Sequence, residues 1–206
     1  NLRNSVQTLH KESISRFGGV AIYISTLITF YLFGYNWNNS ETFQVLLACF
    51  PAFIVGLTDD LKIKIIPKFR LFLLLPVPLI LFFYGNISVN DLHLGPYDDF
   101  LEIELFALLF MCFAFVGMMN AFNLIDGING QLCSYLLSII VALKAIESST
   151  GFALFLSDEF RYLTNILLGS LLGFFFLNLF GKIFLGDAGA YFLGAVTCCA
   201  LIFVQQ

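Results

Sequence analysis

The sequence predicts an all-α protein, a polytopic transmembrane bundle of about seven helices. Of its 206 residues, 59% are hydrophobic and 12% are charged, whereas a soluble domain has about 45–50% apolar and about 25% charged residues. The apolar residues come in long blocks and do not alternate with polar ones, which argues against a membrane β-barrel. The composition also excludes a soluble enzyme domain and, with a net charge of −4, a protein that binds nucleic acid through basic charge.

Seven apolar blocks reach or approach the roughly 20 residues that a helix needs to cross the hydrocarbon core. We expect polar flanks or a thinner bilayer at the second, third and fifth blocks, because these are short. Pro76 and Pro78 predict a kink in the third block, which membrane helices tolerate. In chain order the blocks are 18–35, 43–57, 71–84, 103–122, 132–146, 162–180 and 189–204.

The basic residues predict which ends of these helices face the cytoplasm. If successive helices alternate in direction, one side holds every Lys and Arg except Lys144 and Arg161. We therefore assign that side to the cytoplasmic face of the cell (inner) membrane. It comprises the segments 1–17, 58–70, 123–131 and 181–188.

The two ends of the chain lie close to apolar blocks. The chain opens on polar residues with neither a signal-peptide pattern nor an initiating Met, and it stops directly after the last apolar block. We expect residues 1–206 to form a single transmembrane domain that is truncated at both ends.

The first of three polar clusters on the cytoplasmic side follows the second block. Asp59 and Asp60 are adjacent carboxylates that repel each other, and a divalent cation or a lysine would relieve this repulsion. A hydrophilic stop after the membrane span is the alternative. The basic residues that follow either anchor the loop to anionic headgroups or form a cradle for phosphates; they are Lys62, Lys64, Lys68 and Arg70.

The second cluster closes the fourth block. Asn120 and Asn123 are three residues apart and share a helix face, and Asp126 continues that row if the helix persists. Gly127 and Gly130 permit a sharp turn and a close approach of the backbone to a ligand. Carboxamide and carboxylate oxygens together are a set of ligands that suits Mg²⁺.

The third cluster precedes the last block. Asp187 stands at the start of the seventh predicted helix, where its carboxylate can point at a shared metal ion. An N-cap for that helix is the alternative, because Asp fills this role well. The three clusters share one membrane face and one chemistry, and polar groups near a membrane tend to mark function.

With these clusters the sequence resembles the polyprenyl-phosphate N-acetylhexosamine-1-phosphate transferases of glycosyltransferase family 4. The matching stretches agree in order and spacing across nearly the whole chain. They are LHKESISRFGGVAI (9–22), GLTDDLKIKIIPKFRL (56–71), NAFNLIDGING (120–130) and NLFGKIFLGDAGA (178–190). The resemblance implies a catalytic domain that transfers a sugar 1-phosphate from a UDP-N-acetylhexosamine to a membrane polyprenyl phosphate. It also implies release of UMP and a cytoplasmic Mg²⁺ site, with Mn²⁺ as an alternative ion.

The resemblance further implies a role for each candidate residue. Asp59 and Asp60 match the acidic pair: Asp59 would deprotonate or orient the lipid phosphate, and Asp60 would support the metal-bound centre. Asp187 and Asn123 match Mg²⁺ ligands. For His10, an interfacial polar residue is the alternative to a substrate contact. The residues that match the nucleotide or substrate site are Asn120, Asp126, Lys68, Lys62 and His10.

The donor sugar and the function class have alternatives. The stretch HKESISRFGGVAI favours the GlcNAc-1-phosphate transferases that begin lipopolysaccharide and other cell-wall polysaccharides, with phospho-MurNAc-pentapeptide transferase as the alternative. The His- and Arg-rich recognition loop of the family has no counterpart in 1–206.

An ion-coupled transporter would place polar groups at mid-bilayer, whereas here they gather at helix ends. A catalytically inactive scaffold fits poorly with an intact set of acids. We expect no nucleic-acid partner, and a homodimer is compatible with the sequence.

Overall fold

The computed structural model describes residues 15–32, 41–63, 65–89, 92, 95–150 and 158–205. This part of the chain is helical, and its one β-type contact is an isolated bridge between Ser15 and Ile183. The predicted all-α class is confirmed. The helices are α1 (Gly18–Leu32), α2 (Glu41–Asp60), α3 (Pro67–Leu74), α4 (Pro76–Tyr84), the 3-10 helix η2 (Gly95–Phe100), α5 (Glu104–Ile125), α6 (Gln131–Thr150), α7 (Asp158–Leu179) and α8 (Gly186–Gln205).

Seven apolar segments correspond to the seven predicted blocks. Thr42–Asp60, Pro67–Tyr84 and Glu104–Ile125 are long and apolar enough to cross a membrane. Four shorter apolar helices complete the set: Gly18–Leu32, Gln131–Ala142, Thr164–Leu179 and Gly186–Ile202. The predicted polytopic bundle is therefore confirmed.

The predicted kink in the third block is a break between α3 and α4. Leu75 separates the two helices, and Pro76 begins the second one. Proline is favoured at a first helical position because it lacks the N–H that would have no partner there.

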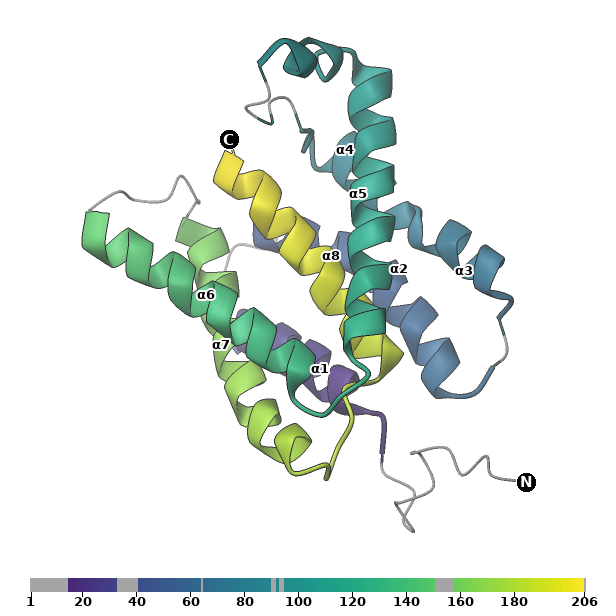
Figure 1. Ribbon diagram of the computed structural model, residues 1–206, viewed down its shortest axis with the longest axis vertical. Helices are drawn as coiled ribbons and strands as arrows, with labels where there is room; N and C mark the ends of the chain where they lie inside the picture. Colours follow the sequence, from purple (N-terminus) through teal and green to yellow (C-terminus); the bar gives the residue numbers. More distant parts are fainter. Residues whose placement is uncertain are drawn as a thin grey trace.

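Helix α8 is the centre of the bundle. It packs most extensively on α2, and next on α5 and α1 (Figure 1). Small residues permit this closeness: the backbones of Gly19 and Gly189 are in contact, and a methyl group added at Gly56 would overlap the backbone of Ala188. Small residues of this kind are typical of helix interfaces in membranes, where they let backbones approach.

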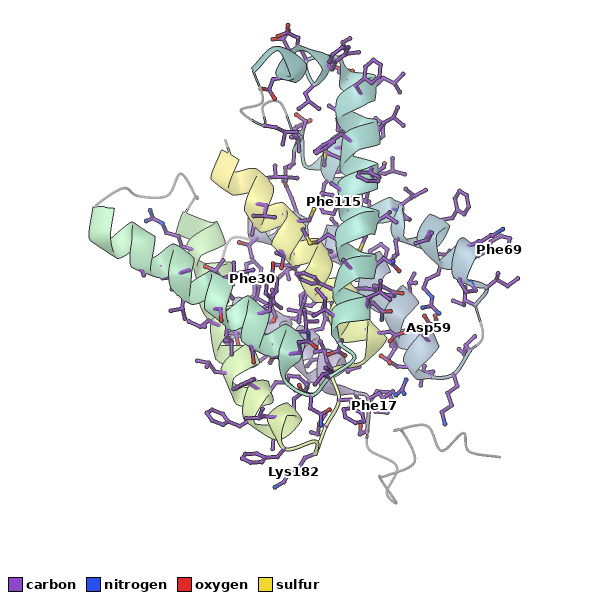
Figure 2. All side chains as sticks on the ribbon, in the orientation of Figure 1. Phe17, Phe30, Asp59, Phe69, Phe115 and Lys182 are labelled. Carbon is purple, nitrogen blue, oxygen red and sulfur yellow. The ribbon has the colours of Figure 1, made fainter. Side chains whose placement is uncertain are left out.

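The phenylalanines divide between the core and the outer surface. Phe30 and Phe115 are fully buried between helices, whereas Phe69 projects outward from α3 (Figure 2). Helix α5 also has an exposed apolar face, to which Leu109 and Phe113 belong. Such faces fit contact with lipid tails.

One end of the bundle joins the segments that carry the polar clusters. The buried carboxamide of Asn178 accepts a hydrogen bond from the Gly130 amide at 2.7 Å and donates one to the Ile183 carbonyl at 2.9 Å. The segment between α7 and α8 also contacts the segment before α1, because the Phe184 amide donates a hydrogen bond to the Ser15 carbonyl at 2.9 Å. These hydrogen bonds hold the end of α7 near the start of α6 and the segment before α1. The ends of α2 and α5 and the start of α8 lie at the same end of the bundle (Figure 1).

Candidate active site

Asp60 caps the first turn of α8. Its Oδ1 and Oδ2 accept hydrogen bonds from the backbone amides of Asp187 and Ala188, each at 3.0 Å. The first amides of a helix have no partner within it and carry the positive end of the helix dipole, so a carboxylate is favoured there. The sequence left an N-cap as the alternative role of Asp187. In the structure the capping carboxylate is that of Asp60 from α2. The side chain of Asp187 instead lies near Arg70.

Gly186 permits this cap. Its φ of +78° lies in the left-handed region, which glycine adopts at little cost. A Cβ at this position would lie 2.6 Å from Oδ2 of Asp60. Both the backbone conformation and the space therefore require glycine.

Asp59 has a different partner, because successive side chains on a helix point about 100° apart. Its Oδ2 lies 2.8 Å from Nε of Arg70 on α3. Both atoms are buried, and neither has a hydrogen-bond partner within the described residues. The contact is thus a buried ion pair. Figure 2 shows Asp59 at the end of the bundle where α5 ends and α8 begins.

Arg70 also connects Asp59 with α8. Its Nη1 donates a hydrogen bond to the Tyr191 hydroxyl at 3.1 Å and lies 3.8 Å from Oδ2 of Asp187. Tyr191 follows Asp187 by one helical turn, so both side chains lie on one face of α8. The carboxyl groups of Asp59 and Asp187 are within hydrogen-bonding reach of each other. Two acids and one guanidinium from three helices therefore form one group.

Sequence reasoning missed two members of this group. Arg70 was one of several basic residues in a loop, and Tyr191 was not singled out. A signal for Tyr191 exists, because a tyrosine in an apolar helix carries a hydroxyl that needs a partner when buried. Its spacing of four residues from Asp187 points to the same face.

Asp126 lies at the carboxyl end of α5. It caps that helix and does not continue it, so the predicted row of Asn120, Asn123 and Asp126 is helical only as far as Ile125. Burial raises the pKa of the Asp126 carboxyl to about 7, and the charges of Asp187 and Asp60 add to this rise. Asp126 therefore lies within electrostatic range of the other acids.

The remaining predicted residues lie outside the acidic group. Asn120 and Asn123 are half-buried near the end of α5, and their roles stay predictions. Lys62 and Lys68 are exposed, and within the described residues neither forms an ion pair with an acid. The basic residue that contacts Asp59 is Arg70, not Lys68. His10 lies outside the described residues.

The acidic group fits a hard divalent cation. Mg²⁺ is usually held by one or two carboxylates, while waters and phosphates complete its shell. Asp59 and Asp187 bring two carboxyl groups within reach of each other. No three His, Cys, Asp or Glu side chains form a ready metal cage in the described part of the chain. A cation held here would therefore depend on solvent and substrate oxygens as well.

The charges of the site are compatible with a divalent cation. Four carboxyl groups, those of Asp59, Asp60, Asp126 and Asp187, face two guanidinium groups. Arg70 pairs with Asp59, and Arg16 acts on Asp60 and Asp126. When all four acids are ionised, the excess of negative charge equals the charge of one divalent cation.

Comparison with known proteins identifies the family. A sequence profile described as Glycosyl transferase family 4 matches residues 42–205, which include every acid of the site. The chain belongs to glycosyl transferase family 4. The predicted resemblance is thereby confirmed.

Several relatives of this family 4 member carry the name phospho-N-acetylmuramoyl-pentapeptide-transferase. The protein from Clostridium botulinum is 30% identical, over 94% of this chain and 61% of its own length. Those from Streptococcus agalactiae and Borrelia duttonii are 32% and 31% identical, over 97% and 90% of this chain and 62% and 59% of their own. The chain thus spans about three fifths of the length of these relatives. Their name is that of the alternative in the sequence analysis, phospho-MurNAc-pentapeptide transferase, and not that of the preferred GlcNAc-1-phosphate transferase.

Proposed function

We propose that the protein transfers a sugar 1-phosphate from a UDP-linked N-acetylhexosamine to a polyprenyl phosphate at the cytoplasmic face of the membrane. The observation that carries this proposal is the group formed by Asp59, Arg70 and Asp187 at one end of a bundle of apolar helices. A charged site in this place can meet a lipid phosphate from the bilayer and a nucleotide from water. Membership in glycosyl transferase family 4 supports the same reaction class.

The reaction forms one phosphorus–oxygen bond and breaks another. An oxygen of the lipid phosphate attacks the phosphorus attached to the sugar, and the bond from that phosphorus to the bridging oxygen breaks, which releases UMP. Phosphoryl transfer depends mainly on alignment and neutralised charge. Asp59 orients or deprotonates the lipid phosphate, while its Oδ2 pairs with Nε of Arg70. Asp187, together with Asn123 as the sequence predicts, would hold Mg²⁺, which would supply positive charge to the diphosphate.

Asp60 has a supporting role in this proposal. Both of its oxygens accept hydrogen bonds from the first turn of α8, so it fixes the backbone that carries Asp187. Asp126, Asn120, Lys62 and Lys68 remain candidates for contacts with the nucleotide or its phosphates.

Two donors are candidates, each for its own reason. The name of the relatives favours UDP-MurNAc-pentapeptide, and the stretch HKESISRFGGVAI favours UDP-GlcNAc. An ion-coupled transporter is disfavoured, because Asp59, Asp60, Asp126 and Asp187 all lie at helix ends and not at mid-bilayer.

The test is a transfer assay with the intact protein purified in detergent. Polyprenyl phosphate, Mg²⁺ and one radiolabelled donor are supplied, and labelled lipid and UMP are measured together. We expect both products in equal amounts with one of the two donors. Absence of lipid labelling with both donors would contradict the proposed function.

A further inference from the structure

The buried hydroxyl of Tyr191 is a polar group that the proposed reaction does not use. Its side chain has no exposed surface, and it belongs to α8, the central helix of the bundle. Such a hydroxyl needs a partner when it is removed from water. Here it accepts a hydrogen bond from Nη1 of Arg70, at 3.1 Å.

Nη1 of Arg70 stands between two acceptors. It is 3.1 Å from the Tyr191 hydroxyl and 3.8 Å from Oδ2 of Asp187. A charged N–H···O hydrogen bond to a carboxylate is about 2.7–2.9 Å long, so Arg70 attracts Asp187 without bonding to it. The Tyr191 hydroxyl therefore holds the guanidinium about 1 Å short of a full salt bridge with Asp187.

The other end of the guanidinium has a fixed neighbour. Nε of Arg70 lies 2.8 Å from Oδ2 of Asp59, so the group is positioned by one acid and one hydroxyl. If the hydroxyl were absent, the carboxylate of Asp187, 3.8 Å away, would be an acceptor for Nη1. A small rotation would then close the gap and cover an Asp187 oxygen.

We propose that Tyr191 is a positioning residue for the metal site, because its hydroxyl holds Arg70 against Asp59 and keeps it from covering Asp187. The carboxylate of Asp187 is thereby left available to a divalent cation. This inference rests on the proposed function, in which Asp187 is a metal ligand. If Tyr191 only filled space in the core, removal of its oxygen alone would leave metal binding unchanged.

The experiment measures Mn²⁺ binding to the intact purified protein by electron paramagnetic resonance, without lipid or nucleotide. Tyr191→Phe keeps the ring and removes the hydroxyl. We expect its dissociation constant for Mn²⁺ to rise about tenfold, the scale of one lost or gained charge-assisted hydrogen bond. The matched control is Tyr23→Phe, which alters a buried tyrosine stacked on Phe53 in the bundle. This control should bind Mn²⁺ like the wild type.

A second pair of variants separates positioning from general damage. In Arg70→Met no guanidinium can cover Asp187, so adding Tyr191→Phe should change Mn²⁺ affinity no further. Such non-additivity is the mark of a direct coupling. Thermal unfolding of each variant shows whether it is folded.

Three results would overturn the inference. They are an unchanged Mn²⁺ affinity in Tyr191→Phe, an equal loss of affinity with and without Arg70, and failure of the wild-type protein to bind Mn²⁺. The transfer assay tests the proposed function separately, so the two failures can be told apart.

Discussion

Asp60 at the end of α2 binds the backbone amide of Asp187 at the start of α8, and Asp187 in turn directs its own side chain toward Arg70. The two acids therefore have different roles at this helix end. Asp60 fixes the backbone of α8, and Asp187 presents its carboxylate to the site. This relationship leads to a prediction about each residue that makes it possible.

Replacement of Asp60 should affect stability as well as activity. Asp60→Ala removes the acceptors of two amides and should lower the free energy of unfolding by about 1–3 kcal/mol. Asp60→Asn keeps one acceptor and should lose less. Thermal unfolding in detergent gives the stability, and the transfer assay gives the rate. An Asp60→Asn protein with wild-type stability and no transfer would contradict the supporting role and favour direct catalysis by Asp60.

Gly186→Ala should be strongly destabilising. The new methyl group would collide with the Asp60 carboxylate. The alanine would also have to keep the φ of +78° that Gly186 has, in the left-handed region that favours glycine. We expect a loss of at least about 2 kcal/mol in the free energy of unfolding. Gly117→Ala is the matched control, because a Cβ at Gly117 meets nothing within 4 Å. Equal melting temperatures for the two variants would speak against the cap as described.

Arg70 should matter more for transfer than Lys68. Arg70 contacts Asp59 and lies near Asp187, whereas Lys68 is exposed and has no acidic partner among the described residues. Arg70→Met should lower kcat/KM by roughly 10–100-fold, the scale of about 1.4–2.8 kcal/mol of transition-state energy. Lys68→Met should stay within about threefold of the wild type. A larger loss in Lys68→Met than in Arg70→Met would make Lys68, and not Arg70, the principal basic residue of the site.

Asp59→Asn and Asp187→Asn should each abolish most of the transfer. Both changes keep the shape of the side chain and remove the negative charge that would hold a cation or accept a proton from the lipid phosphate. We expect at least a hundredfold loss of labelled lipid, about 2.7 kcal/mol of transition-state stabilisation. Asp99→Asn alters an exposed acid of η2 and should transfer at the wild-type rate. Undiminished labelling in either site variant would remove that residue from the catalytic group.

The bundle could be predicted from the sequence because a bilayer imposes a strong local rule. A span needs about 20 apolar residues, so each helix is visible in its own segment, and Pro76 marks the break at Leu75 without reference to any other helix. Residues such as Asp59 and Asp187 stood out for the same reason, since acids are rare in an apolar chain.

The partners of these acids could not be predicted in this way. Asp60 and the amide it caps are 127 positions apart, and nothing in either segment shows which of two neighbouring acids faces α8. The ion pair of Arg70 depends equally on how α3 turns after α2. Such pairings follow from tertiary packing, and a sequence pattern records only the residues that take part.

Asp126 should make the stability of the metal-free protein depend on pH. Its pKa is about 7 in the folded protein and about 4 in an unfolded chain, so between these values the folded state binds more protons than the unfolded state. Stability must then fall as the pH rises from about 4 through about 7, and the loss is complete above that range.

Asp126→Asn cannot ionise and should escape this loss. At pH 8 in EDTA we expect its free energy of unfolding to exceed that of the wild type by about 2 kcal/mol, with little difference at pH 4. Thermal unfolding of both proteins at the two pH values is the measurement, and a parallel pH dependence would show that Asp126 is not the responsible group.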